Sequence, residues 1–590
     1  PEVQTQAQVK HPRRQEANYW DPKIITWDTP ELQIDCTAKL KKLDPLAAPG
    51  PSGMSNRFLS ALSSRVWPIG SEAEQAVPRL NHFANLYMNA KLPAWYMQLM
   101  LSVRQIGLDK GKKWIDNNTD YRFLGIGESL RRLFWNEAFN NHGKCFRSFF
   151  EPQQLAMGTP AGGQTLALGT AILMEQYPEH VFIQDDIQNM FGEALRKEGV
   201  KNILANSGCI KWHKIIETEN YPITNIYFEG DQGKLNLAPW QYEEGGQQGA
   251  TVSSLTACAA IQPYLKRLDE RLRPHCGSAR KGIDDGVTHG PPEVLWTAIE
   301  EFYKDIRENC GLEVNRSKTR VYSPNGNYGG KPQEFKIGSV TSILPNHLNG
   351  GPTEITAEGL NIWGVATSQD GDFIRANLAA KTKEVCSNIN NITNSLNSLS
   401  PDVAFTVLRL SLQARLQYHQ QTHRHDLLSN TNQAVQNTLD KAVNQIFGFD
   451  PRSPDNYSED PATLHDPSIM SDLIALPARN KVLGLRRMDD FVGAAASIGG
   501  WDMVSRNFID RTDEEGNRLQ GLYPLLESVF GPNSQDPENA DTRFLHFTNG
   551  QSRIGTQFGE AFNLLRQKAP GEVSGPLSRS VVSLRPTNAK

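Results

Sequence analysis

Two pairs of adjacent aspartates constrain this chain more than any other feature of its sequence. Asp185 and Asp186 end a short apolar run (V-F-I-Q) that is typical of a buried strand. Asp284 and Asp285 lie in a glycine-flanked segment (G-I-D-D-G) that fits a β-hairpin. Pairs of hard divalent cations, held about 3.5–4 Å apart, need carboxylates from different strands side by side. A single acidic pair is common in solvated turns, so the segments around both pairs decide the interpretation.

Composition excludes several classes of protein. The chain has 590 residues, so we expect three or four packed units. Apolar residues make up 38% and charged residues 21%, which excludes a wholly disordered or collagen-like chain. The net charge of -4 excludes a protein that simply coats nucleic acid, so any such binding must use local patches.

Cysteine usage and hydropathy indicate where the protein works. Seven scattered cysteines without any C-x-x-C argue against a disulfide framework and a zinc knuckle. The sequence has no run of 18 apolar residues and no apolar core near its start for a signal peptide. We therefore expect a soluble, intracellular protein without a membrane partner. The choice between nucleus and cytoplasm stays open.

Hydrophobic patterning favours an α+β fold for the first two thirds and a mostly helical remainder. Residues 1–30 are polar, rich in proline, and indicate a loose lead-in. A helix is predicted from Gly192 and another over 250–268, where Pro263 kinks or divides it. Long helical patterns fill 375–450.

The segments around the aspartates resemble a reverse transcriptase of the kind carried by non-LTR retroelements. That family's first block, D-x-x-N-A-F-N, resembles residues 186–192 (D-I-Q-N-M-F-G), and an arginine follows at Arg196. Its Q-G turn before a long helix resembles 246–251 (G-Q-Q-G-A-T), and its aromatic-x-D-D hairpin is matched in part at 282–286. Its G-L-x-x-N-x-x-K block resembles 311–318 (G-L-E-V-N-R-S-K).

Further matches are colinear with these blocks. A-P-G-P-D-G-I resembles 48–54, R-P-I-x-x-G-E-x-L-R-R-L resembles 122–133, and L-G-x-P-I-G resembles W-G-V-A at 363–366. L-P-x-x-x-G-G-L-G-L-R resembles 476–486. The resemblance implies a right-hand polymerase whose palm is an antiparallel sheet with helices. The implied parts are an N-terminal lead-in (1–30), fingers (31–180), palm (181–375), helical thumb (376–450) and C-terminal extension (451–590).

The resemblance also implies a catalytic centre. Asp186 and Asp284 would hold two Mg²⁺ or Mn²⁺ ions, with Asp285 as a third carboxylate and the Ile187 carbonyl as a further metal ligand. Lys318 matches the family lysine that protonates the leaving pyrophosphate, although a surface lysine would look the same. Catalytic roles thus fall on Asp186, Asp284, Asp285 and Lys318.

The incoming nucleotide has its own set of implied residues. Lys110 and Arg122 would hold the triphosphate, and a guanidinium suits bidentate phosphate contacts. Phe191 would act as a steric gate against a 2′-hydroxyl, and Gly249 would let the backbone approach the nascent base pair. The implied nucleotide-binding residues are Lys110, Arg122, Ile187, Phe191, Gln248 and Gly249.

Departures from the family pattern indicate a divergent lineage or a decaying copy. The aromatic residue of the hairpin is Gly282, and the asparagine after Phe191 is Gly192. Losing the aromatic residue removes a support for the primer end. None of the changes removes a metal carboxylate.

Two clusters beyond the motifs suggest further roles. Residues 263–281 carry six basic and two acidic residues, and we expect them to follow template phosphates. His419, His423 and His425 suggest a zinc site, but the absence of a supporting Cys or His favours a polar helix face.

The function predicted from these matches is an RNA-directed DNA polymerase. Its partners would be an RNA template, a primer with a free 3′-hydroxyl, and dNTPs. No endonuclease or RNase H region is recognisable, so target cutting would need a separate endonuclease. One alternative is an RNA-dependent RNA polymerase, which Phe191 argues against. The other is a catalytically inactive, reverse-transcriptase-like RNA-binding protein.

Overall fold

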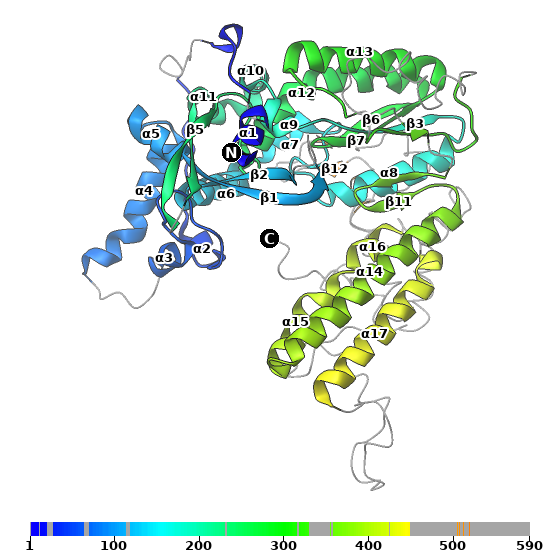
Figure 1. Ribbon diagram of the computed structural model, residues 1–590. Coiled ribbons are helices and arrows are strands. Elements are labelled where there is room, and N and C mark those ends of the chain that lie inside the picture. Colours follow the sequence, from blue (N-terminus) through cyan, green and yellow to red (C-terminus); the bar gives the residue numbers. More distant parts are fainter. Residues whose placement is uncertain are drawn as a thin grey trace. The chain divides into compact units, whose positions relative to one another are not determined.

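A computed structural model shows a mixed α+β chain that divides into two compact units (Figure 1). The first unit contains residues 1–159, 183–320 and 329–354, and the second contains 160–182, 321–328 and 355–590. The proposed limits of fingers, palm and thumb stay predictions. The residues that the structure describes are 2–10, 12–20, 28–63, 70–113, 119–230, 233–315, 318–329, 354–355, 358–423, 425–448, 504, 507, 511–512 and 518–519.

The first unit contains a four-stranded mixed sheet with the strand order β2-β1-β4-β5. Its strands are β1 (Val103–Lys113), β2 (Thr119–Gly127), β4 (Thr224–Glu229) and β5 (Leu235–Tyr242). β1 pairs antiparallel with β2 and parallel with β4. Side chains alternate across a strand, so one face can be apolar. That face buries Phe123, Trp240 and Tyr242 in one cluster.

A second sheet of the first unit carries the predicted hairpin. β6 (Ser278–Gly282) and β7 (Asp285–Gly290) pair antiparallel, and β3 (Val181–Asp186) lies next to β7. All five residues of β6 (S-A-R-K-G) are buried, although two of them are basic and would be expected at the surface. Short strands β8 (Arg320–Tyr322) and β9 (Glu354–Ile355) occur where the chain passes between the units in sequence.

Helices of the first unit include the one predicted over 250–268 and a second long helix after the hairpin. α12 (Thr251–Leu272) continues through Pro263, so of the two expected effects of this proline, a kink or a division of the helix, the division is wrong. α13 (Pro292–Cys310) ends at Gly311 in the left-handed conformation that glycine favours. The others are α1 (Glu2–Lys10), α2 (Thr37–Leu40), α3 (Asn56–Ala61), α4 (Ala76–Met88), α5 (Ala94–Leu101), α6 (Ser129–His142), α7 (Lys144–Phe150), α9 (Met190–Glu193), α10 (Arg196–Leu204) and α11 (His213–Asn220).

The described residues 2–10 and 12–20, which fall within the predicted N-terminal lead-in, make defined contacts with the first unit. α1 lies along the edge of β2, because the Gln6 side chain donates to the Thr119 carbonyl (2.6 Å) and accepts from the Tyr121 N–H (3.1 Å). Arg14 is buried and donates to the carbonyl oxygens of Tyr221 and Glu243. Polar side chains here supplement one apolar anchor, Ala7, which is fully buried in the cluster on the sheet.

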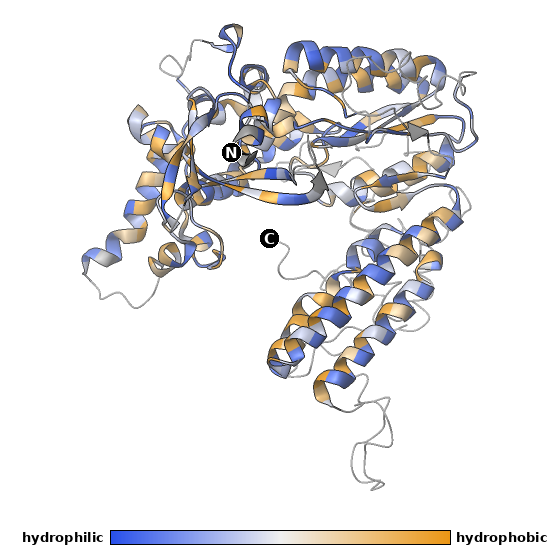
Figure 2. Ribbon diagram, viewed as in Figure 1, coloured by the Kyte–Doolittle hydropathy of each residue, from blue (hydrophilic) through white to orange (hydrophobic). Residues whose placement is uncertain are grey.

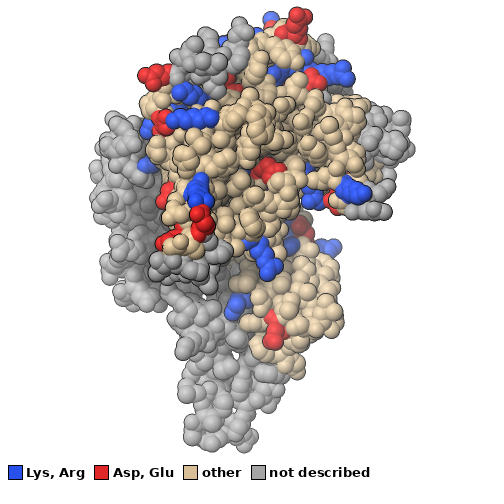
Figure 3. Space-filling model, turned by 90° about the vertical axis from the view of Figure 1, so that its left-hand side faces the viewer, with Lys and Arg blue, Asp and Glu red and all other residues tan. Residues whose placement is uncertain are grey.

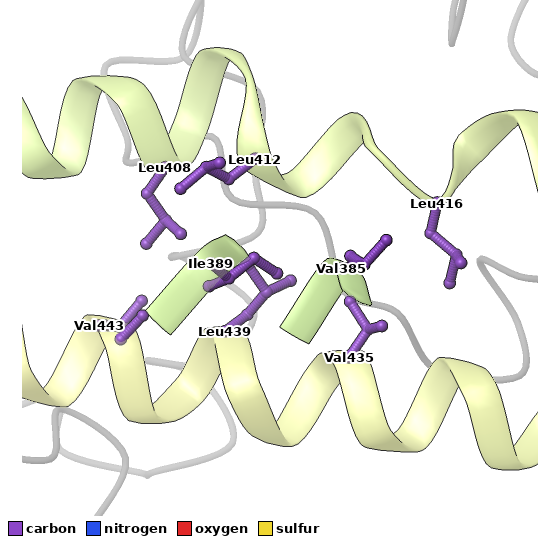
Figure 4. Close-up of a cluster of buried hydrophobic side chains, with 9 residues drawn as sticks. Val385, Ile389, Leu408, Leu412, Leu416, Val435, Leu439 and Val443 are labelled. Atoms are coloured by element: carbon purple, nitrogen blue, oxygen red, sulfur yellow. The ribbon is translucent and has the colours of Figure 1, made fainter. Parts of the chain in front are cut away.

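The second unit is mainly helical. Its elements are α8 (Gly162–Gln176), α14 (Gly371–Asn397), α15 (Pro401–Leu410), α16 (Gln417–Thr422), α17 (Ser429–Phe447), β10 (Leu360–Ile362), β11 (Val365–Thr367), β12 (Arg511–Thr512) and β13 (Arg518–Leu519). Figure 2 shows hydrophobic and polar residues alternating around α14, α15 and α17, as amphipathic helices require. Their apolar sides meet in one core, where Ile389, Leu408 and Leu439 point toward one another (Figure 4).

Local signals set the ends of these helices. The Asp370 side chain accepts from the Asp372 N–H before α14, and the Ser400 side chain accepts from Val403 before α15. The W-G pair at Trp363 and Gly364, both with positive φ, makes the tight turn between β10 and β11. The 476–486 match and most of the predicted C-terminal extension lie outside the described residues.

The histidine cluster is not a polar helix face. His419 and His423 are only 6% and 4% exposed, and His425's side chain lies outside the described residues. The Nδ1 atom of His423 lies 2.9 Å from the His419 carbonyl oxygen, which fixes Nδ1 as the donor of that hydrogen bond. Within the described residues, no group of His, Cys, Asp and Glu is arranged to hold a metal ion. Among the described helices, none has the length and apolar character needed to cross a membrane.

Acid should destabilise the second unit through His423. Burial lowers the pKa of His423 from 6.5 to about 4. The unfolded chain therefore takes up a proton between pH 6.5 and pH 4 while the folded chain does not, so stability falls as pH falls through that window. The difference of 2.5 pH units corresponds to roughly 3 kcal/mol. Denaturant unfolding at pH 7 and pH 5 should show a smaller loss for His423→Gln than for the native chain; equal losses would contradict this assignment.

Candidate active site

The end of β3 and the β6–β7 hairpin bring the two acidic pairs together in the first unit. The Ile187 N–H donates to the Asp284 carbonyl oxygen over 3.2 Å, which ties the residue after Asp186 to the hairpin turn. The Asn315 N–H donates to the Asp186 carbonyl oxygen over 2.8 Å on the other side. The juxtaposition that the sequence predicts for residues 98 apart is therefore present.

Crowding of acidic groups raises their affinity for protons. Burial, followed by the charges of Asp284 and Asp186, raises the pKa of Asp285 to about 7. Burial also raises the pKa of Asp284, with the Asp186 charge adding to the effect. Carboxylates that repel one another in a half-buried site favour binding of a cation, which would stabilise their ionised forms.

Lys318 supplies one such positive charge. Its Nζ lies 2.8 and 3.0 Å from the two carboxylate oxygens of Asp186. The Lys318 N–H donates to the Asn315 carbonyl, so the G-L-E-V-N-R-S-K segment folds the lysine back toward β3. Its side chain remains 55% exposed, which leaves the ammonium able to turn toward another anion.

The donor set suits a hard divalent cation, although the side chains do not yet converge on one. Asp186, Asp284, Asp285 and the Ile187 carbonyl offer only oxygen atoms, the ligands that Mg²⁺ and Mn²⁺ prefer. The described residues contain no three-ligand cluster. Since the Lys318 ammonium contacts both Asp186 oxygens, metal binding at Asp186 requires Lys318 to move.

A buried ion pair lies beneath the hairpin. Lys281 on β6 and Asp185 on β3 have side chains that are 1% and 0% exposed, and Nζ lies 2.5 Å from Oδ1. The Tyr303 hydroxyl on α13 donates to the other carboxylate oxygen over 3.1 Å. Asp185 precedes Asp186 by one residue, so this contact fixes the strand that carries the predicted metal ligand against β6.

The hairpin turn holds a strained residue. Ile283 has φ +76°, a conformation that β-branched residues rarely adopt and that costs on the order of 1–3 kcal/mol. Its N–H donates to the Gln154 side-chain oxygen over 3.1 Å. The strand edge is held as well, because the Lys281 N–H donates to the Gln153 carbonyl and the Lys281 carbonyl accepts from Leu155. These contacts support the turn, which Gly282 cannot do because it has no side chain.

A second buried network positions the Q-G turn. Arg131 donates to Glu219 (2.6 Å) and to the side-chain oxygen of Gln247 (3.2 Å). The Gln248 carbonyl then accepts from the Gly125 N–H on β2 (3.3 Å). Gly249, at φ +108°, is exposed beside it. Arg131 belongs to the R-R-L end of the motif at 122–133, but the resemblance assigns it no role. Apart from its charge, nothing in the sequence indicates that Glu219 takes part in the site.

Arg196 proves to be structural. It is buried and donates to the carbonyl oxygens of Gly245 (2.5 Å) and Tyr242 (3.0 Å), the chain segment that leads into the Q-G turn. Glycine is required at 245 itself, because a Cβ there would lie 2.3 Å from the Gly192 backbone.

The predicted nucleotide-binding residues lie on several elements of the first unit. Arg122 on β2 is exposed, and Lys110 on β1 pairs with Asp120 over 2.9 Å. Phe191 on α9 is half-buried, and its carbonyl accepts from Gly246. Ile187 is 1% exposed, so only its backbone is a plausible contact.

A cavity of about 550 Å³ adjoins the hairpin. Gly249 and Ile283 line one part of it, and Lys144, Arg147 and Phe146 from α7 line another. Aromatic rings beside basic side chains suit a base and its phosphate. Sequence patterning missed α7, because its two cations lie in an otherwise apolar segment (K-C-F-R-S-F-F).

The phosphate-tracking role predicted for the basic segment 263–281 stays a prediction, and two of its six cations are not available for it. Arg280 and Lys281 are buried, and Arg280 pairs with Asp269. Each of the other cations has a carboxylate partner: Lys266 with Glu270, Arg267 with Asp305, Arg271 with Glu301 and Arg273 with Asp269. On the face drawn in Figure 3, some basic and acidic side chains lie beside one another and other basic side chains stand apart.

A double-mutant cycle should show that Asp185 and Lys281 stabilise the fold only as a pair. Lys281→Met leaves a buried, uncompensated carboxylate and should lower the free energy of unfolding by about 3–5 kcal/mol. Combining it with Asp185→Leu should restore most of that loss, because two apolar side chains avoid the desolvation cost. Denaturant unfolding measures both. Additive losses in the double variant would show that the two side chains do not interact.

Comparisons with known proteins do not identify a function for this chain, so the function is argued from the residues of the site. No family model and no curated protein matches the chain. Among solved structures, the chain is similar to apo telomerase from Candida tropicalis truncated from its C-terminal domain, with 10% identity and a TM-score of 0.28. The similarity covers 38% of this chain and 50% of the telomerase chain, so the chain spans about half of that neighbour. A likeness this weak carries no argument about function.

Proposed function

We propose that this chain is an RNA-directed DNA polymerase of the non-LTR reverse transcriptase type. The observation that carries the proposal is the meeting of Asp186 with Asp284 and Asp285 at one end of β3, with Lys318 beside them. Four colinear blocks of the sequence supply these residues and the Q-G turn. Its substrates would be dNTPs, an RNA template and a primer with a free 3′-hydroxyl.

The carboxylates would hold the metal ions of nucleotidyl transfer. Asp186, Asp284, Asp285 and the Ile187 carbonyl would bind Mg²⁺ or Mn²⁺, which supplies a lower pKa at the primer hydroxyl and charge neutralisation at the leaving pyrophosphate. The Asp185–Lys281 pair keeps the two carboxylate-bearing strands in register. Lys318, released from Asp186, would hold a proton for the pyrophosphate oxygen.

Nucleotide selection would depend on the elements around this centre. Arg122 and Lys110 offer cations to the triphosphate, and Phe191 presents a half-buried ring that would exclude a 2′-hydroxyl. The cavity beside Gly249 and Ile283 has room and chemistry for the templating base. The ring at 191 argues against an RNA-dependent RNA polymerase.

A catalytically inactive RNA-binding protein is the second candidate. The ion pair of Lys318 with both oxygens of Asp186 favours it, because that contact neutralises a predicted metal ligand. Primer extension distinguishes the two. Extension of oligo(dT) on poly(rA) with dTTP, in Mg²⁺ or Mn²⁺, supports the polymerase; duplex binding without extension in either metal supports the inactive protein.

Asp284→Asn should abolish extension while leaving duplex affinity within about twofold. The substitution removes a charged metal ligand and keeps the side-chain volume, so template contacts should persist. Asn390→Ala, an exposed change in α14 of the second unit, is a control that should leave the rate unchanged. Parallel extension and filter-binding assays measure the two properties. Loss of duplex binding together with extension would refute the metal-site assignment.

Phe191→Val should weaken discrimination against ribonucleotides. A smaller side chain leaves space for the 2′-hydroxyl, and lost steric exclusion on the order of 2 kcal/mol corresponds to roughly 30-fold in the ratio of kcat/KM values for dTTP and UTP. Single-nucleotide incorporation with each substrate gives that ratio. An unchanged ratio, with extension intact, would show that another residue selects the sugar.

A further inference from the structure

The N-terminal helix α1 contacts both sides of the proposed nucleotide site through one residue. Nζ of Lys10 lies 2.5 Å from Asp120 and 2.6 Å from the Tyr121 carbonyl oxygen on β2. The Lys10 carbonyl oxygen accepts from the Asn189 side chain over 3.0 Å. Asn189 lies between Asp186 and Phe191 in the sequence, so Lys10 spans from the predicted triphosphate strand to the predicted metal and sugar residues.

Lys10 joins a group of cations on this strand edge. Asp120 accepts from Lys10 with one oxygen and from Lys110, 2.9 Å away, with the other. Residues two apart on a strand share a face, which places Arg122 on the same side as Asp120. Three cations and one carboxylate leave an excess of positive charge. Burial lowers the pKa of Lys10, and the nearby Lys110 charge lowers it further, so an added anion would be stabilised here.

The sequence accommodates this contact at Gly192. A Cβ at residue 192 would lie 2.6 Å from the Lys10 carbonyl oxygen, closer than any side chain permits. The reverse-transcriptase pattern has asparagine at this position, and an asparagine would displace Lys10. Glycine at 192 therefore allows α1 to approach the first catalytic block, which links that departure to the N-terminal helix.

We propose that Lys10 is a third cation of the nucleotide site and contacts the triphosphate together with Lys110 and Arg122. The inference rests on the polymerase proposal. It adds the N-terminal helix, which sequence patterning treats as a lead-in, to the substrate-binding surface.

Steady-state extension on poly(rA)/oligo(dT) tests the proposal. Lys10→Gln keeps a donor for Asp120 but removes the charge, and should raise KM for dTTP on the order of tenfold with kcat within about twofold. Lys10→Arg should stay near the native KM. Lys197→Met is the matched control, because Lys197 also anchors the N-terminal segment, donating to the Ala17 carbonyl over 2.8 Å.

The outcomes separate charge from structural anchoring. An unchanged KM in Lys10→Gln, or an equal rise in Lys197→Met, would overturn the role of Lys10 while leaving the polymerase proposal intact. Should the native chain not extend primers, equilibrium binding of Mg²⁺-dTTP decides: weaker binding by Lys10→Gln alone supports the Lys10 site without polymerisation, and absence of binding by the native chain refutes both. Thermal unfolding of each variant identifies any that fails to fold.

Discussion

The buried contact between Asp185 and Lys281 is the constraint on which the candidate site depends. Removing two charges from water costs several kcal/mol per ion, and only close, fully hydrogen-bonded geometry offsets that cost. Here Tyr303 donates to the second carboxylate oxygen, and Lys281 Nζ lies 5.8 Å from the Phe302 ring centroid. Because the pair joins β3 to β6, it holds the end of β3 that carries Asp186 close to the hairpin turn that carries Asp284.

The hairpin turn is supported without the aromatic residue that the resemblance leads us to expect at position 282. Gly282 removes the aromatic residue that the resemblance leads us to expect, and Ile283 adopts a strained positive φ. Gln154 and the ion pair support the turn from either side in compensation. Similarly, Gly192 stands where the resembling pattern has asparagine, and a Cβ there would lie 2.6 Å from the carbonyl oxygen of Lys10 at the end of α1. These departures are consistent with a divergent site whose parts have changed together, rather than with unrelated losses.

Much of the fold and the candidate site could be predicted where local pattern is strong. β3, the hairpin at 282–286 and α12 follow from apolar runs, flanking glycines and helical spacing. The meeting of the aspartates follows from strands sharing a sheet. The sequence could not show that Lys281 and Arg280 are buried, because cations in a sequence indicate solvent unless their distant partners are known. The anchoring of α1 by Gln6, and of the segment after α1 by Arg14, could not be predicted either, because their partners are more than 100 residues away in the sequence.

The central claim is that three carboxylates, those of Asp186 on β3 and of Asp284 and Asp285 in the hairpin, together bind two divalent ions. Titration of Mn²⁺ followed by electron paramagnetic resonance, with primer–template and a non-reacting dNTP analogue present, tests it most directly. The account predicts two exchange-coupled ions per chain, as expected for ions about 3.5–4 Å apart, and loss of the coupling in Asp285→Asn. Binding of no ion, or of isolated ions that persist in Asp285→Asn, would contradict it.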